Sequence, residues 1–372
     1  MLLAYSASRV LTASLLALAY WRAVAEDRSV AQFDEMPDFL GFLQSWDGQN
    51  YRQIALEGYP DRLPRNGDGD IAKNTWAFLP LYPLILRVLL GTGADIEVLA
   101  VGASIVFGGA AAVVLHRLLL ERVSPTSALW GAVLFSFAPL SFVLQVAYAE
   151  SLFLLLLFSA LLAMEQRRYL VMIPLGVAAA FAHPGALALP AAIGLATAIR
   201  LYQGQRMPRR TLARAALAAL LIAAAGFSWP LIAAAVTGQR DAYFLTELAW
   251  WRVHIGEVTF VPFTPWFLMA DRYGGWAGIV AVAVLMVAVG LALFSAPARE
   301  FGTTLTSYFG AYLAYLFAVF LPQQSIFRML LPLAPVLGAV SLTTTRRRLL
   351  TLTVFIALQP AAILLLWIKQ PP

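Results

Sequence analysis

Long apolar segments separated by short polar connections run along the whole chain. Most are about 17 to 25 residues long, the length that an α-helix needs to cross about 30 Å of hydrocarbon. Backbone amides in lipid must be paired within their own segment, and a membrane barrel would show alternating segments instead of blocks rich in Leu and Ala. The pattern therefore predicts an all-α polytopic membrane protein with about 11 transmembrane helices.

The apolar run at residues 1–25 is longer than a signal-peptide core, so we predict a retained first transmembrane helix. Residues 26–94 form the longest polar stretch and are predicted to be the first outer loop, with the remaining helices in 95–372 of one membrane domain. Basic connections are typical of cytoplasmic loops. The strongest basic cluster consists of Arg200, Arg206, Arg209, Arg210 and Arg214. With this cluster inside, the aromatic-rich connections fall on the outer face.

The same orientation predicts where the later helices turn. The hairpin 126–166 turns outside near 145–150, and residues 169–200 turn near His183. The two helices of 169–200 are short, so a re-entrant path for part of this segment is left open. After a helix at 212–237 comes an outer loop at 238–273. Further helices are predicted near 274–296, 304–321, 328–344 and 349–368.

Composition agrees with a membrane location. Hydrophobic residues make up 61% of the chain and charged residues only 12%, whereas soluble domains carry roughly 25% charged residues. The net charge of +6 does not indicate nucleic-acid binding, because the positive residues lie in short loop clusters. The chain has no cysteine, which excludes disulfides, thiolate nucleophiles and cysteine metal sites.

The first outer loop contains a carboxylate flanked by aromatic residues, Trp46-Asp47. After Pro37, the apolar residues up to Trp46 have helical spacing, which predicts an amphipathic helix in the membrane interface that presents Asp47 at the surface. The segment 77–90 contains two prolines and is short for a crossing. It is predicted to be a second interfacial or re-entrant helix, with a full crossing left open.

Three motifs together resemble the PIG-V-type mannosyltransferase family of the GT-C superfamily. They are Trp46-Asp47 with Tyr51, Ile54-Ala55, Gly58-Tyr59 and the following Ala77-Phe78-Leu79-Pro80-Leu81-Tyr82-Pro83; Tyr148-Ala149-Glu150-Ser151-Leu152-Phe153; and Arg328-Met329-Leu330-Leu331-Pro332. The resemblance implies a GT-C-like helical bundle that moves a sugar, mannose in the family, from a polyprenyl phosphate donor to a lipid or glycolipid acceptor. One departure is Ala182-His183-Pro184-Gly185, where the family often has an Arg-Ser-Asn-Gly-like element.

Transfer from a polyprenyl phosphate sugar requires a base more than an acid. The phosphate leaves with little need of protonation, whereas the acceptor hydroxyl must lose its proton to a nearby carboxylate, giving inversion. Asp47 is the candidate general base. The alternative, compatible with the first, is that Asp47 caps the following helix. Its neighbours Trp46 and Tyr51 are predicted to contact substrate.

The donor phosphate needs cationic partners. Arg328 is the leading candidate, because a guanidinium can grip phosphate oxygens in a bidentate way; the alternative is an interfacial anchor. Gln324 beside it is a predicted substrate contact. Arg52, Arg252 and His254 are further phosphate-binding candidates in outer loops, each with the alternative of a solvated or headgroup contact.

Two other polar residues border apolar helices. Glu150 begins an apolar run, where a carboxylate is costly unless it faces a substrate or an interhelical partner. His183 lies beside Pro184 and Gly185, a predicted helix break where freed backbone groups often line cavities. It is either a site residue or a packed histidine. We predict that Glu150, His183, Arg328 and Asp47 surround one cavity on the outer face, open to the bilayer and to the outer aqueous phase.

No cofactor is predicted, and a divalent cation is left open. Asp68 and Asp70 form a D-x-D pattern, but a single-phosphate donor has less need of a metal ion. Ile71 and Ala77 occupy the positions where a calcium loop has Gly and Glu. The segment is therefore predicted to be a solvated turn. The three histidines lack zinc-ligand spacing.

Two other functions remain open. A transporter or flippase of a lipid-linked sugar would also need many helices, but transporters tend to show broken helices in two related halves, and the first loop has no counterpart in the second half. A non-catalytic subunit of a glycosylation complex is third. High Ala and Arg with little Lys indicates a GC-rich bacterium, so the predicted location is a bacterial plasma membrane, or the endoplasmic reticulum in a eukaryote. The expected partners are donor, acceptor and membrane lipids, with no nucleic acid.

Overall fold

The computed structural model describes residues 1–26, 37–339 and 344–369, and the regular elements within these ranges are helices. In this part of the chain, six helices are long and apolar enough to cross a membrane, and three shorter apolar helices accompany them. These helices confirm an all-α polytopic membrane protein. The number of crossings, about 11 by the length rule, stays a prediction.

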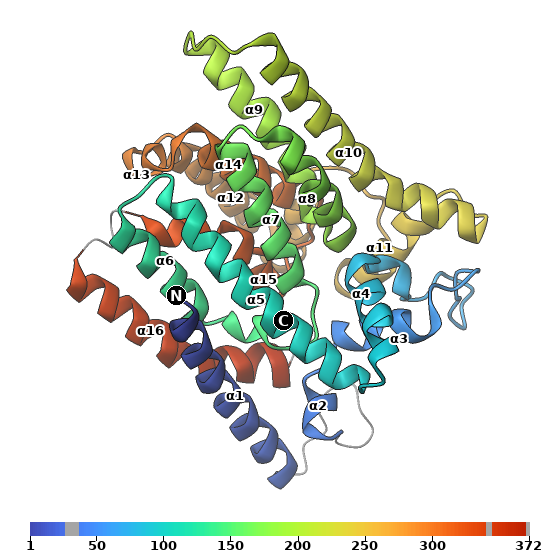
Figure 1. Cartoon of the computed structure of the whole chain (residues 1–372). Coiled ribbons are helices and arrows are strands. Elements are labelled where there is room, and N and C mark those ends of the chain that lie inside the picture. The colour runs from blue at the N-terminus through green and yellow to red at the C-terminus, as the bar shows by residue number, and fades with distance from the viewer. Residues whose placement is uncertain (27–36, 340–343, 370–372) are drawn as a thin grey trace. The chain divides into compact units, whose positions relative to one another are not determined.

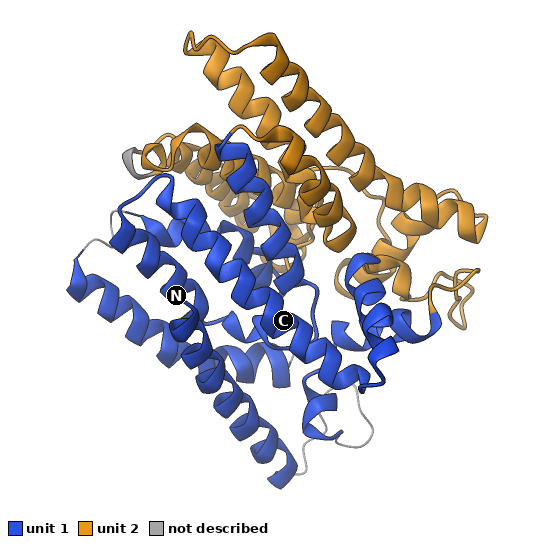
Figure 2. Ribbon diagram, in the orientation of Figure 1, with its two compact units in different colours: residues 1–57, 80–166, 324–372 blue, residues 58–79, 167–323 orange. Residues whose placement is uncertain are grey.

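The chain divides into two compact units, each assembled from segments that are distant in sequence (Figure 2). Unit 1 consists of residues 1–57, 80–166 and 324–372. Unit 2 consists of residues 58–79 and 167–323. The predicted first outer loop therefore contributes to both units, and its residues 27–36 lie outside the described residues.

The helices of unit 1 are α1 (Leu2–Ala25), α2 (Phe39–Phe42), α3 (Asp47–Glu57), α4 (Leu81–Leu89), η2 (Leu90–Thr92), α5 (Ile96–Leu120), α6 (Pro125–Phe137), η3 (Ser141–Leu144), α7 (Glu150–Glu165), α15 (Ile326–Met329), η5 (Leu331–Gly338), α16 (Thr345–Ile363) and η7 (Leu364–Ile368). Helix α5 packs against α6 and α7, and α1 packs against α5, α6 and α16 (Figure 1). Small residues permit the close approach of α1 and α5, because a Cβ at Gly108 would lie 2.5 Å from the Tyr5 hydroxyl oxygen. That hydroxyl donates to the Ile105 carbonyl at 2.8 Å.

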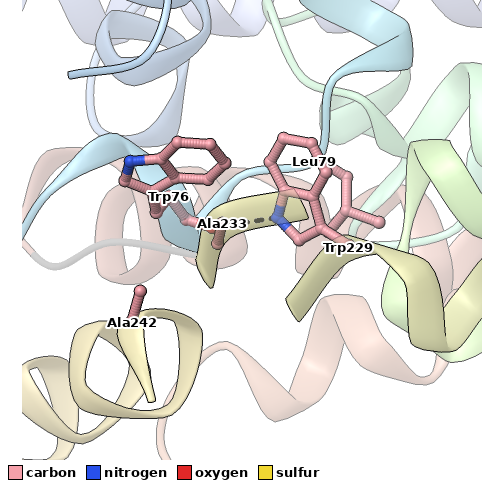
Figure 3. Packing of buried hydrophobic residues seen from close by; sticks show 5 residues of the cluster. All are labelled: Trp76, Leu79, Trp229, Ala233 and Ala242. Atoms are coloured by element: carbon pink, nitrogen blue, oxygen red, sulfur yellow. Dashed lines mark hydrogen bonds between the residues drawn. The ribbon is translucent and has the colours of Figure 1, made fainter. Parts of the chain in front are cut away.

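The helices of unit 2 are η1 (Thr75–Ala77), α8 (Tyr169–Ala182), η4 (Pro184–Leu187), α9 (Ala188–Tyr202), α10 (Arg209–Thr237), α11 (Ala242–Ile255), α12 (Pro265–Leu293), α13 (Ala296–Glu300) and α14 (Gly302–Val319). Trp76, from the first loop, packs with Leu79 against Trp229 and Ala233 of α10 and Ala242 of α11 (Figure 3). A buried indole N–H needs an acceptor, and Trp229 Nε1 donates to the Trp76 carbonyl at 3.1 Å. This cluster fixes residues 58–79 to the rest of unit 2.

The predicted amphipathic helix between Pro37 and Trp46 is wrong. Helix α2 is a single turn, and Trp46 has φ of 61°, outside the right-handed helical region. Phe42, Leu43 and Trp46 are buried within unit 1, and Trp46 Nε1 donates to the Trp367 carbonyl at 2.9 Å. These apolar side chains therefore pack against protein. An apolar sequence pattern is the same for side chains that are buried in protein and for side chains that lie in the membrane interface.

The single helix predicted near 328–344 is also wrong. Helix α15 ends at Met329, and the 3₁₀ helix η5 follows, because Pro332 and Pro335 lack the N–H groups that an α-helix needs. Residues 340–343 lie outside the described residues. Helix α4 and the 3₁₀ turn η2 that continues it cover Leu81–Thr92, or about 18 Å at 1.5 Å per residue. This segment is shorter than the hydrocarbon thickness of about 30 Å, and its placement in the membrane stays a prediction.

The later helices agree with prediction more closely. The hairpins at 126–166 and 169–200 and the helices near 212–237, 304–321 and 349–368 are present. Helix α12 begins at Pro265, earlier than predicted, and Gly275 at φ 53° kinks it near the expected start. The predicted outer loop 238–273 contains α11.

Candidate active site

Three charged side chains that are distant in sequence meet in unit 1. Arg328 Nη2 lies 2.6 Å from Asp47 Oδ2, and Arg328 Nη1 donates to Glu150 Oε1 at 2.8 Å. The side chains of Arg328, Asp47 and Glu150 are 15%, 17% and 5% exposed. One guanidinium thus bridges two largely buried carboxylates, and charge-assisted bonds of this kind are among the stronger ones in proteins.

Each member of this cluster is positioned by the start or end of a short element. Asp47 is the first residue of α3, where a negative charge is favoured by the helix dipole. Glu150 begins α7, and Arg328 lies in the single turn α15. The Ala147 N–H donates to the Leu43 carbonyl at 3.1 Å, which holds the segment before Asp47 beside the segment before Glu150.

Tyr148 completes the cluster and was not predicted as a site residue. The guanidinium carbon of Arg328 lies 5.2 Å from the centroid of the Tyr148 ring, within cation–π distance. The Asp47 backbone N–H donates to the Tyr148 hydroxyl at 3.3 Å. The sequence signal was its position two residues before Glu150 in the second motif.

The pKa values in this cluster are shifted by burial and by the charges. Burial raises the pKa of Tyr148 well above its ordinary value, and the Asp47 charge raises it further. Burial lowers the pKa of Arg328, but the carboxylates of Asp47 and Glu150 outweigh this effect and raise that pKa overall. Near neutral pH the phenol is therefore protonated and the guanidinium charged.

Tyr51 of α3, Tyr82 of α4 and Ser104 of α5 form a second layer beside the cluster. The ring of Tyr51 packs edge-to-face on Tyr82, with centroids 5.2 Å apart. The Tyr82 hydroxyl donates to the Ala100 carbonyl at 3.0 Å and lies 3.0 Å from Ser104 Oγ. Ser104 Oγ donates to the Tyr148 carbonyl at 3.2 Å. Tyr51, predicted to contact substrate, is thus buried against the residues that position Tyr148.

Several buried polar atoms of unit 1 have no hydrogen-bond partner within the described residues. They include Glu150 Oε2 and Arg328 Nε, and also Gln44 Nε2 and Gln145 Oε1. Sequence reasoning missed both glutamines, which precede Asp47 and Tyr148 by three residues each. Because buried polar atoms are normally paired, these atoms indicate contacts with polar ligand atoms or water.

The structure gives the remaining candidates other surroundings. Trp46 is buried and hydrogen-bonded to the Trp367 carbonyl. Arg52 is half-exposed and pairs with Glu97 at 3.2 Å. Gln324 is partly buried in unit 1, four residues before Arg328.

Arg252, His254 and His183 belong to unit 2. Arg252 pairs with Asp70 at 3.5 Å and with Glu257. His254 lies in the last turn of α11. His183 Nδ1 accepts the Gly185 N–H at 3.0 Å at the break between α8 and η4. Their functional roles stay predictions.

The D-x-D segment forms an exposed, hydrogen-bonded turn. Asn66 Oδ1 accepts the backbone N–H groups of Asp68 at 3.1 Å and Asp70 at 2.9 Å. Within the described residues, no three His, Asp or Glu side chains are grouped in a way that could hold a metal ion. Whether the activity needs a metal stays a prediction.

Comparison with known proteins identifies relatives of the chain. Curated relatives include the GPI alpha-1,6-mannosyltransferase 2 of Cricetulus griseus, 32% identical over 156 residues, or 39% of this chain and 29% of the relative. The Homo sapiens protein of the same name is 31% identical over 140 residues, or 35% of this chain and 26% of the relative. These alignments therefore span less than a third of each relative's length.

The model of one family, Mannosyltransferase (PIG-V), matches residues 5–233. This range is more than half of the chain and contains Asp47, Tyr148 and Glu150, whereas Arg328 lies beyond it. The chain therefore belongs to the mannosyltransferase (PIG-V) family, which confirms the resemblance carried by its motifs.

Proposed function

We propose that this protein is an inverting mannosyltransferase that moves mannose from a polyprenyl phosphate to a hydroxyl of a lipid or glycolipid acceptor, with Asp47 as general base. Family membership supports the mannosyl transfer. The relatives named GPI alpha-1,6-mannosyltransferase 2 support a glycolipid acceptor. The observation that carries the assignment of residues is the guanidinium of Arg328 held between Asp47 and Glu150.

In the proposed step, the acceptor oxygen attacks the anomeric carbon while Asp47 takes its proton. The bond between the anomeric carbon and the phosphate oxygen breaks, and its electron pair leaves with the polyprenyl phosphate. Attack opposite the leaving group inverts the anomeric configuration. The Asp47 side chain keeps 17% exposure, so a hydroxyl can reach it, and general-base catalysis contributes typically about 10²- to 10⁴-fold.

Arg328 would receive the negative charge of the departing phosphate. Its Nε has no hydrogen-bond partner among the described residues and can donate to a phosphate oxygen while Nη1 keeps its bond to Glu150. A phosphate would compete with Asp47 for Nη2, because both are anions within reach of one cation. Donor binding would thus weaken the ion pair between Arg328 and Asp47 and free the Asp47 carboxylate to contact the acceptor hydroxyl.

We place this reaction at the outer face of a cell membrane, with a bacterial plasma membrane as the setting. The arginine-rich connections support that orientation, since such loops are typical of the cytoplasmic side. In a eukaryotic cell the same face would be turned to the lumen of the endoplasmic reticulum. The donor carries a single phosphate, so we expect transfer to be retained in EDTA.

The test is transfer of radiolabelled mannose from polyprenyl phosphate mannose to candidate lipid acceptors by purified protein. We expect Asp47→Asn to lower the rate by about 100-fold or more, since it removes the base. Asp68→Asn is the matched control, because it removes the same charge from the exposed turn of the same loop, and its rate should stay unchanged. Full transfer by Asp47→Asn would refute the assignment of the base. If no phosphosugar donates its sugar, but labelled lipid moves across liposome membranes that contain the protein, the result would favour a flippase.

A further inference from the structure

A buried arginine of α9, without a carboxylate partner in the described part of the chain, contacts α14 within unit 2. Arg200 is only 4% exposed. Its Nη2 donates to Thr304 Oγ1 at 2.7 Å, whereas its Nη1 has no hydrogen-bond partner among the residues that the structure describes. None of the ion pairs found in the described part of the chain includes Arg200. Because buried charges are normally paired, Arg200 lacks the counter-charge that its position requires.

Another buried arginine shows the usual arrangement. Arg9 of unit 1 is 6% exposed. Its Nη1 donates to the Ser141 carbonyl at 2.6 Å, its Nη2 to the Ser136 carbonyl at 2.9 Å and its Nε to Ser8 Oγ at 3.3 Å. Arg9 is therefore satisfied by the protein alone, and Arg200 is not.

The Arg200 guanidinium lies against the N-terminal turn of α14. Thr304 is the third residue of this helix, and no side chain caps its N-terminus. The first peptide N–H groups of a helix carry positive partial charge and bind anions. The guanidinium adds positive charge where the helix is already positive, so an anion would stabilise both.

Unpaired hydroxyl groups continue along the same two helices, which pack against each other. Thr197 Oγ1 lies one turn before Arg200 on α9, and Ser307 Oγ and the Tyr308 hydroxyl lie one turn after Thr304 on α14. Within the described ranges none of the three has a hydrogen-bond partner, and both Ser307 and Tyr308 are fully buried. Such hydroxyls suit a ligand rich in oxygen atoms.

Arg200 also lies at the depth of a lipid head group. The apolar segment Pro184–Tyr202 is long enough to cross a membrane, and Arg200 is two residues, or about 3 Å, from its end. Arg206 follows in the exposed connection between α9 and α10, and Arg209 and Arg210 are the first two residues of α10. The connection between these two helices can be followed in Figure 1. Positive residues next to a span attract anionic lipids.

We propose that Arg200, Thr304 and the first turn of α14 bind the phosphate group of an anionic membrane lipid. The phosphate oxygens would accept from Arg200 Nη1 and from backbone N–H groups in the first turn of α14. The headgroup phosphate is the counter-charge that unit 2 itself does not supply to Arg200. This site is independent of the proposed mannosyl transfer, since none of its residues takes part in that step.

The experiment measures phosphatidylglycerol binding by the full-length protein in nanodiscs, by native mass spectrometry and by the shift of the unfolding temperature. Matched nanodiscs of phosphatidylcholine alone give the baseline. We expect phosphatidylglycerol to bind and stabilise the wild type, and Arg200→Gln to weaken binding about tenfold or more, since it removes a charged hydrogen-bond donor. Arg240→Gln is the control, because it removes an exposed charge beyond the other end of α10, and its binding should match the wild type.

If Arg200→Gln does not fold, Thr304→Val serves as a second variant, because valine keeps the shape of the threonine side chain. It removes the acceptor of Arg200 Nη2 and should weaken binding several-fold. Equal phosphatidylglycerol affinity in the wild type and in whichever variant folds would overturn the proposal. Titration of inorganic phosphate into phosphatidylcholine nanodiscs tests the other source of the anion. Saturable stabilisation by phosphate that needs Arg200, with none added by phosphatidylglycerol, would show a soluble-anion site and overturn the assignment to a lipid.

Discussion

Replacing Arg328 with Met should destabilise unit 1 through the two carboxylates that it leaves behind. Removing one partner of a buried ion pair costs about 3–5 kcal/mol, because the other charge stays buried without compensation. The Glu150 side chain is 5% exposed, so it should bear most of this cost, whereas Asp47 at 17% is better hydrated. We therefore expect a loss of about 3 kcal/mol, near the lower end of that range.

A double-mutant cycle separates this effect from lost packing. Replacing both partners, Arg328→Met with Glu150→Met, removes the unpaired charge, and apolar replacement of a whole buried pair is often close to neutral. The double variant should therefore be more stable than Arg328→Met alone, with a coupling free energy of about 1–3 kcal/mol. The assay is the unfolding midpoint of purified protein in a titration with denaturing detergent.

The loss of unfolding free energy in Arg328→Met, relative to the wild type, should also depend on pH. Burial raises the pKa of Glu150, and the substitution removes the Arg328 charge that most opposes this effect. Glu150 therefore binds its proton more tightly when folded than when unfolded, so the variant should gain stability as the pH falls from 8 towards roughly 5. The double variant should show this dependence more weakly. Additive losses in the cycle, or a deficit independent of pH, would refute the view that Arg328 neutralises buried charge.

Three further substitutions test other parts of the structure. Tyr148→Phe keeps the ring beneath the guanidinium but loses the acceptor of the Asp47 N–H; we expect a several-fold lower transfer rate, about 1 kcal/mol, and an unchanged rate would argue against a positioning role. Trp229→Phe removes the donor to the Trp76 carbonyl and should lower the free energy of unfolding by about 1–3 kcal/mol, as for other unsatisfied buried groups. Gly131→Val should destabilise unit 1 by about 1–3 kcal/mol, because even a Cβ there would lie 2.7 Å from a Leu119 methyl carbon. For both of the last two variants the measurement is the unfolding midpoint. A midpoint equal to that of the wild type would show that the Trp229 hydrogen bond, or the close approach at Gly131, does not contribute to stability.

Much of the helical framework could be predicted, because hydrophobic length and basic loops are local properties of the chain. The turn at His183 and the helices α8 and α9 on either side of it follow from that reasoning. The errors occurred where prolines or backbone geometry decide the outcome. Pro332 and Pro335 produce a 3₁₀ segment where a continuous helix was expected, and the positive φ of Trp46 ends the predicted helix before Asp47.

The candidate site could be predicted only in part. Asp47, Glu150 and Arg328 were each identified separately, but with alternatives such as a helix cap, an interhelical pair or an interfacial anchor. The structure shows that Glu150 and Asp47 both pair with Arg328. Tyr148 was missed because a tyrosine within an apolar motif has no distinctive pattern. Its role depends on its contact with the Arg328 guanidinium, which is distant in sequence.

By itself the sequence determined the membrane class, the helical framework and the motifs that assign the chain to its family. These features depend on segment length, local composition and residue order. Only the tertiary structure decided which charges meet, since Glu150 and Arg328 are separated by 178 positions. It also decided that Trp46 is buried in protein and that Arg200 has no carboxylate partner among the described residues. Pairing and burial are set by packing in three dimensions, and the order of residues along the chain does not record them.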